Sequence, residues 1–118
     1  MSGITILLRP CGKTAALSVT NSAHAEITVE SNTNENVTQA AFLNTGASVL
    51  AISLAPSGNT PETPAIPSDG NTTDSLILAP NMTSPVVVIT PPCPFNLKAI
   101  SGSSTASVLY VMPVGAQS

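Results

Sequence analysis

The chain has 118 residues, of which 42% are hydrophobic and only 8% are charged, with a formal net charge of −3. Its three cations are too few for the basic face that binds nucleic acid, and no apolar run approaches the about 20 residues that cross a bilayer. Residues 1–12 lack the basic and apolar regions of a secretory signal. We therefore expect a chain that is made in the cytoplasm and that contacts neither nucleic acid nor membrane.

Alternation of apolar and polar residues is the main signal in the first part of the chain. It predicts strands at residues 4–8, 15–20 and 24–30. The last of these alternates most strictly, with Ile27 and Val29 on its apolar face. Each of these segments therefore has one face suited to a core and one suited to solvent.

Two pairs of later segments have the pattern of β-hairpins. Residues 38–43 and 48–54 flank Asn44-Thr45-Gly46, whose Asn and Gly tolerate the backbone angles of a tight turn. Residues 97–100 and 106–112 flank a short Ser- and Gly-rich stretch in the same way. We predict that each pair forms two neighbouring strands of one sheet.

Residues 56–74 form the least regular segment and contain four prolines. Proline fixes φ and removes a hydrogen-bond donor, so this segment cannot be a central strand. It is either a disordered loop or a semi-extended arm, because proline restricts a chain that glycine and serine would leave flexible. The only apolar spot inside it is Ala65-Ile66. We expect an arm that docks Ile66 on a neighbouring molecule.

Further strands are predicted at residues 76–78 and 86–90, and no stretch has a sustained helical period with caps. Short strands separated by short polar gaps favour an all-β fold. We predict one domain over residues 1–118, a single antiparallel β-sandwich or barrel-like domain of about seven to nine short strands.

The late strands lack the alternation of a strand with one wet face. Both residues 86–89 and residues 106–112 are apolar on both faces over part of their length. We expect another subunit to cover one of these faces and predict a homo-oligomer, either a dimer or a trimer. Tyr110 is the expected anchor of the interface. The interface candidates are Ile66, Val87, Ile89, Leu109, Tyr110 and Val111.

Few residues have a pattern that indicates chemistry. His24, Glu26 and Glu30 share one strand face and could seed a metal site, but a solvated strand face explains them better. Cys11 and Cys93 are too few for a zinc site, and without a secretory signal we expect thiols rather than a disulfide. No Gly-x-Ser-x-Gly motif is present. We therefore predict no catalytic residue, no cofactor and no bound metal.

Four segments carry a resemblance to a known family. They are Ile4-Thr5-Ile6-Leu7-Leu8-Arg9-Pro10, residues 13–20, residues 41–52 with their Asn44-Thr45-Gly46 turn, and Val108-Leu109-Tyr110-Val111 with the Pro and Gly that follow. In this pattern the chain resembles small virion proteins of tailed bacteriophages. The resemblance implies a β-sandwich protein that accompanies the capsid and has no catalytic residues.

The resemblance leads to a capsid decoration or cement protein that stabilises a phage head. Its partners would be the major capsid protein or other virion proteins, and its location the virion. One alternative is a head fibre or a tail or neck adaptor. Another is a carbohydrate-binding, adhesin-like module, although aromatic residues, which commonly stack on sugar rings, make up only 3% of the chain. An enzyme is the least favoured class, because ionisable groups are so few.

Overall fold

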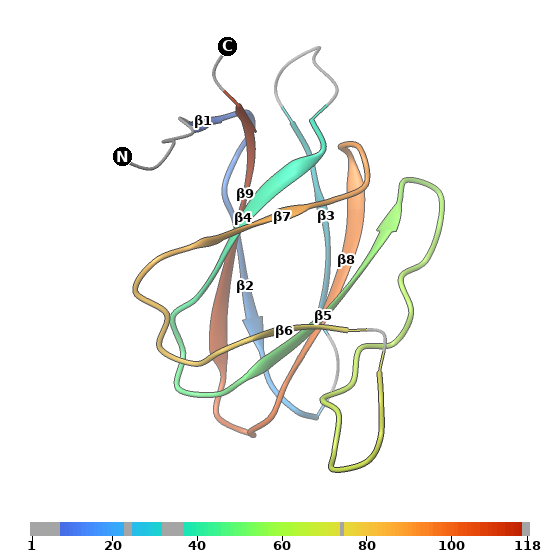
Figure 1. The fold of residues 1–118 in the computed structure, drawn as a ribbon, viewed down its shortest axis with the longest axis vertical. Helices are drawn as coiled ribbons and strands as arrows, with labels where there is room; N and C mark the ends of the chain where they lie inside the picture. Colours follow the sequence, from blue (N-terminus) through green and yellow to red (C-terminus); the bar gives the residue numbers. More distant parts are fainter. Residues whose placement is uncertain (1–7, 23–24, 32–36, 74, 117–118) are drawn as a thin grey trace, which may run out of the picture.

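The computed structural model describes residues 8–22, 25–31, 37–73 and 75–116 (Figure 1). These ranges contain strands and connecting segments but no helix. His24, and the strand expected at residues 4–8 apart from Leu8, lie outside the described residues. The strands are β1 (Leu8–Pro10), β2 (Ala15–Val19), β3 (Ala25–Val29), β4 (Gln39–Asn44), β5 (Leu50–Pro56), β6 (Leu76–Leu78), β7 (Val86–Ile89), β8 (Phe95–Ser101) and β9 (Ser107–Ala116).

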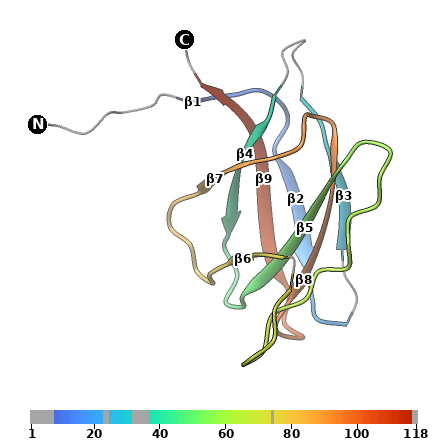
Figure 2. The ribbon, with the colours of Figure 1, turned by 45° about the vertical axis from the view of Figure 1, so that its right-hand side comes forward.

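The strands form two antiparallel sheets packed face to face (Figures 1 and 2). In the first sheet β9 lies between β4 and the successive short strands β1 and β2, and β7 forms the far edge beyond β4. The second sheet has the order β3-β8-β5-β6. Two four-stranded layers with the orders 2-9-4-7 and 3-8-5-6 have the connectivity of a jelly roll. The predicted all-β sandwich is confirmed.

Both predicted hairpins are wrong, because their strands lie in different sheets. β4 belongs to the first sheet and β5 to the second, and β8 and β9 are divided in the same way. Within the described residues, β5 and β6 are the only pair of consecutive strands that are neighbours in one sheet. Turn residues next to two alternating segments indicate a reversal of direction. They do not indicate whether the chain returns within its sheet or crosses to the other.

Asn44 shows why the segment after β4 is a corner between sheets. Its side chain is fully buried, and its Nδ2 donates to the carbonyl oxygens of Ser48 and Ala79 at 2.8 and 3.0 Å. Its Oδ1 accepts from the N–H of Gly46 at 3.1 Å. A side chain at Gly46 would collide with Ser107 of β9. The corner therefore needs the Asn for its hydrogen bonds and the Gly for its close approach.

The core lies between the sheets and is mainly aliphatic. Its largest members are Phe42 from β4 and Phe95 from β8, with Leu and Ile residues around them. Leu109 and Val111 of β9 are fully buried in this core. This placement corrects their assignment as interface candidates, because neither side chain reaches the surface of the chain. Both faces of β9 are apolar in sequence, and its pairing with β4 decides which one faces inward.

The long connection from β5 to β6 lies along the second sheet (Figures 1 and 2). Near its start, Asn96 Nδ2 of β8 donates to the Asn59 carbonyl at 2.9 Å. Further on, Ile66 lies beside the opposite end of β8, where a side chain at Gly102 would meet Ile66 Cδ1 and Val49 Cγ1 at 3.1 and 3.0 Å. We call residues 59–66 the strap.

The strap crosses the outer face of the second sheet. Asn96 and Gly102 are six positions apart, which corresponds to about 20 Å of strand, and an extended segment as long as the strap spans a similar distance. The side chains under it point away from the core, yet Ala51, Ser53 and Lys98 are all buried. Within the Pro-rich segment, residues 59–66 run along β8, and Ile66 lies beside Gly102 of its own chain. Docking of Ile66 on a neighbouring molecule stays a prediction.

Replacing Ile66 tests whether the strap contributes to stability. Ile66→Ala is expected to lower the free energy of unfolding by about 1–2 kcal/mol, because a half-buried aliphatic side chain loses part of its apolar contact. Glu62→Ala, an exposed change in the same strap, is the matched control and should stay within about 0.5 kcal/mol of the parent protein. Urea denaturation followed by circular dichroism measures both. Equal effects of the two changes would contradict the packing of the strap.

Candidate functional site

The outer face of the first sheet is where exposed apolar side chains gather. Tyr110 and Met112 alternate with the core residues of β9 and so point outward. Across the strand pair, Tyr110 lies opposite Leu43 and Met112 lies opposite Ala41. Directly opposite residues on one face of a sheet are in contact distance. The two strands therefore build one continuous apolar surface on the side away from the second sheet.

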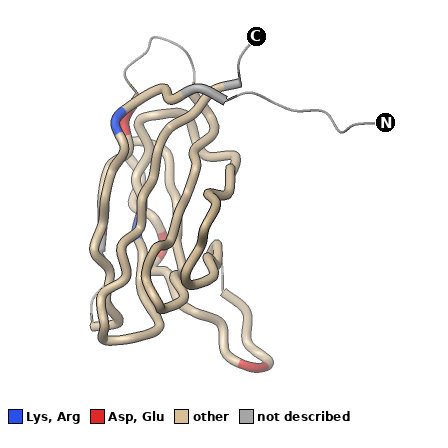
Figure 3. The backbone as a smooth tube through the Cα atoms, turned by 90° about the vertical axis from the view of Figure 1, so that its left-hand side faces the viewer, with Lys and Arg blue, Asp and Glu red and all other residues tan. Residues whose placement is uncertain are grey.

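This surface is hollowed into a groove of about 290 Å³, which we call the outer groove. Its described lining residues are Thr14, Ala41, Leu43, Pro85, Tyr110 and Met112. None of them is charged, and Thr14 and Tyr110 are the only ones with polar side-chain atoms. Figure 3 shows that long stretches of the backbone carry no charged residue. The volume is at the lower end of the range of small-molecule sites, about 300–1,000 Å³, and suits a few side chains of a partner.

Strand β7 extends the same face to the edge of the sheet. Val87 lies opposite Ala41 and Ile89 lies opposite Gln39, so both are on the outer side. The exposed fraction is 41% for Val87 and 79% for Ile89. The outer groove and β7 together leave an uncharged strip of aliphatic and aromatic side chains in contact with solvent.

The structure divides the six predicted interface residues into three groups. Val87, Ile89 and Tyr110 share the outer face of the first sheet. Ile66 belongs to the strap on the second sheet, and Leu109 and Val111 belong to the core.

Sequence reasoning missed Ala41 and Leu43 as lining residues of the outer groove. A signal for them exists, because residues 40–43 are all apolar. A strand with this pattern has an apolar side chain on each face, and only one of those faces can point into the core.

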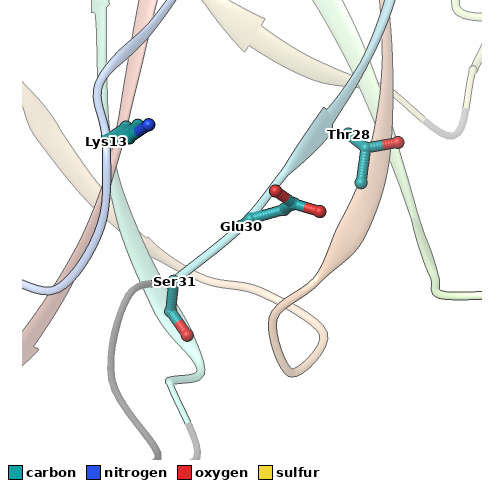
Figure 4. A pocket seen from close by; sticks show the side chains of 4 residues that line it. All are labelled: Lys13, Thr28, Glu30 and Ser31. Atoms are coloured by element: carbon teal, nitrogen blue, oxygen red, sulfur yellow. The ribbon is translucent and has the colours of Figure 1, made fainter.

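A second, polar hollow of about 270 Å³ lies at the side of the sandwich near the ends of β2 and β3. Its lining residues are Lys13, Thr28, Glu30 and Ser31, and Figure 4 shows the Glu30 carboxylate between Thr28 and Ser31, with Lys13 on a neighbouring segment. Lys13 and Glu30 are both exposed, so water screens their charges. We assign no binding role to this hollow.

A row of polar side chains crosses the outer face of the second sheet. Glu26 lies opposite Lys98, and Lys98 lies opposite Ser53. A serine beside a lysine can be a nucleophile beside its base, but that chemistry needs a hydrogen bond between them. Ser53 Oγ has no hydrogen-bond partner among the described atoms. Ser53 and Lys98 are buried and Glu26 is exposed, and we assign no catalytic role to this row.

Both cysteines are thiols, Cys11 buried and Cys93 half-buried. Burial raises the pKa of the Cys93 thiol, and the charge that Cys11 would carry as a thiolate raises it further. Because the thiolate is the reactive form, a raised pKa makes Cys93 a poor nucleophile at neutral pH.

Within the described ranges, no group of three or more His, Cys, Asp or Glu residues is arranged to hold a metal ion. This finding leaves the His24 hypothesis untested, since His24 is outside those ranges. In the same ranges no helix is long and apolar enough to cross a membrane. Comparisons with protein-family models, with curated proteins and with solved structures find no match to this chain.

The raised pKa of Cys93 predicts a pH dependence of stability. The unfolded thiol loses its proton at a lower pH than the folded one, so the free energy of unfolding should be level at neutral pH. It should fall as the pH rises from about 8.5, the ordinary value, through the raised folded pKa. Denaturant titrations between pH 7 and pH 10 measure this fall. Cys93→Ser is expected to make it smaller, and an identical fall in this variant would contradict the assignment.

Proposed function

We propose that this chain is a non-enzymatic structural protein of a phage particle, a decoration or cement protein that binds the head from outside and stabilises it. The observation that carries the proposal is the outer groove with its uncharged surroundings on one face of the sandwich. Exposed apolar surface costs free energy in water and is retained where a partner covers it. The partner in this proposal is the major capsid protein.

The strap over the second sheet supports the choice of the first sheet as the binding face. The strap lies over the outer side of β5 and β8, where Ala51, Ser53 and Lys98 are buried. The flanking strands of the same face stay open, since Glu26 of β3 and Ile77 of β6 are exposed. The outer face of the first sheet has no equivalent cover among the described residues. A protein that works by burial against neighbours would bind through this uncovered face.

The jelly-roll connectivity supports the proposal by analogy of fold only. Viral capsid domains use it, but so do lectin domains and cupins. Sugar sites need several polar groups placed to fix the hydroxyls, whereas the outer groove offers only the side chains of Thr14 and Tyr110. The carbohydrate-binding alternative is thus less well supported by the groove. A head fibre or a tail or neck adaptor would use the same apolar face with a different partner.

A charge in the outer groove tests the proposal. Tyr110→Glu should keep the fold, because the Tyr110 side chain reaches solvent, and should lower incorporation into particles at least about tenfold, as loss of an aromatic anchor does. Ser104→Glu places the same charge on an exposed loop and is expected to leave incorporation unchanged. Tagged chains are expressed in the source cell, particles are purified by density gradient, and mass spectrometry measures the ratio of tagged chain to major capsid protein.

The copy number separates the remaining outcomes. A fixed ratio to the major capsid protein, close to a simple fraction, is expected for a decoration protein. A few copies at one vertex or on the tail would favour the fibre or adaptor alternative. Absence of the parent chain from purified particles would overturn the virion proposal. Equal incorporation of Tyr110→Glu and Ser104→Glu would overturn the assignment of the outer groove.

A further inference from the structure

Strand β7 is the outermost strand of the first sheet and is paired on one side only among the described residues. Its sequence, Val-Val-Val-Ile, has high strand propensity and no charge. Natural sheets usually protect such an edge with a lysine, a bulge or a proline, because an open edge pairs with other chains. The backbone N–H and C=O groups on the open side of β7 therefore decide what kind of strand can pair with it.

The hydrogen-bond pattern shows which backbone groups face outward. The Thr90 N–H donates to the Thr38 carbonyl at 2.7 Å, which makes this a hydrogen-bonded pair of the antiparallel ladder. Such pairs alternate, so Val88 and Val86 also direct their backbone groups toward β4. Val87 and Ile89 must then direct their N–H and C=O groups toward the open edge. No hydrogen bond to these two N–H groups is found among the described residues.

Prolines bound this open edge on both sides. Pro85 and Pro91 have the same parity as Val87 and Ile89 but carry no N–H. The edge therefore offers two donors, at Val87 and Ile89, and no more. Prolines at these positions prevent a long strand from pairing along the whole edge. The stretch between them is uncharged and available for pairing, and its Ile89 is 79% exposed.

We propose that β7 pairs antiparallel with β7 of a second copy about a two-fold axis at Val88. Val87 then lies opposite Ile89 of the partner subunit, and Ile89 lies opposite Val87 of the partner subunit. Each copy contributes its two edge donors, and each donor meets a carbonyl of the other copy, so two donors from each of two copies give four hydrogen bonds. This inference goes beyond the proposed function and does not depend on it.

The prolines argue for a second copy and for this register. Pro85 lies opposite Pro91 of the partner subunit, where neither residue has an N–H to leave unpaired. A shift by two residues would place Val87 or Ile89 opposite a proline and leave a carbonyl without a donor. A two-fold axis makes the two edges complementary by symmetry, and the absence of charge on β7 avoids repulsion between like strands.

The pairing has a consequence for the shape of the assembly. A two-fold axis perpendicular to the sheet keeps the outer faces of both copies on the same side. The two first sheets become one continuous sheet, and the two outer grooves face the same way. One strand pair buries less than the about 1,200 Å² of a standard stable interface, so a reversible dimer is expected.

Removing one edge donor tests the proposal. Ile89→Pro removes only an N–H that points away from β4, and edge strands tolerate proline at such positions. Its dimer dissociation constant is expected to rise more than about tenfold, because each copy loses a donor and the ring blocks approach of the partner. Ile89→Ala keeps the N–H and is the matched control, which should still dimerise. Analytical ultracentrifugation over a concentration series measures all three proteins, with circular dichroism as a check of folding.

Crosslinking tests the register and does not rely on the proline variant. Chains with Val87→Cys and Ile89→Cys, both in a background with Cys11→Ser and Cys93→Ser, are mixed and oxidised. The mixture should form a disulfide-linked heterodimer, because opposite Cα atoms are about 5.5 Å apart. Val87→Cys alone should crosslink poorly, because diagonal neighbours are about 7–8 Å apart. A monomeric parent protein, a dimer unaffected by Ile89→Pro, or equal crosslinking in both samples would overturn the proposal.

Discussion

The strap determines which surfaces of this molecule are left for partners. A sandwich of two sheets has two inner faces, which bury each other, and two outer faces, which need polar side chains or a cover. This chain has very few charged residues, so it cannot solvate both outer faces with charge. Residues 59–66 cover the outer side of β5 and β8, with Ile66 beside Gly102. Among the described residues, the exposed large apolar side chains are Val86, Val87, Ile89 and Tyr110 on the first sheet and Ile77 on the second.

On the first sheet, the outer groove and the open edge of β7 are formed by neighbouring strands. The pairing of β9 with β4 turns Leu109 inward and Tyr110 outward, and the pairing of β4 with β7 places Val87 beside the same outer surface. The outer groove and the open β7 edge are thus adjacent parts of one uncharged region. If two copies pair through β7, the dimer doubles the surface that is available to a larger partner. In the proposed function, the same face would serve both self-association and docking on a shell.

Local pattern predicted the strands well, since the alternating residues 15–20 contain β2 and the expected strand at residues 76–78 is β6. It did not predict the connections. The Asn44 corner depends on the carbonyl of Ala79, and no local signal in residues 44–46 indicates that partner. Leu109 was assigned to the wrong side for a similar reason, because two apolar faces are equivalent until the partner strand is known. Ile66 was recognised as the one large apolar residue of its segment, but its position beside Gly102 of the second sheet is non-local.

The most direct test of the account is amide hydrogen exchange, followed by mass spectrometry, on the free chain and on the chain bound in its native assembly. Exchange should be slower in the assembly for peptides that cover β7 and the outer-groove strands β4 and β9. Val87 and Ile89 should change most, because their amides point to the open edge and have no hydrogen-bond partner among the described residues. Peptides from the strap and from β8 should exchange alike in both states. Slower exchange confined to the strap or the second sheet, with β7 unchanged, would contradict the claim that the first sheet is the binding face.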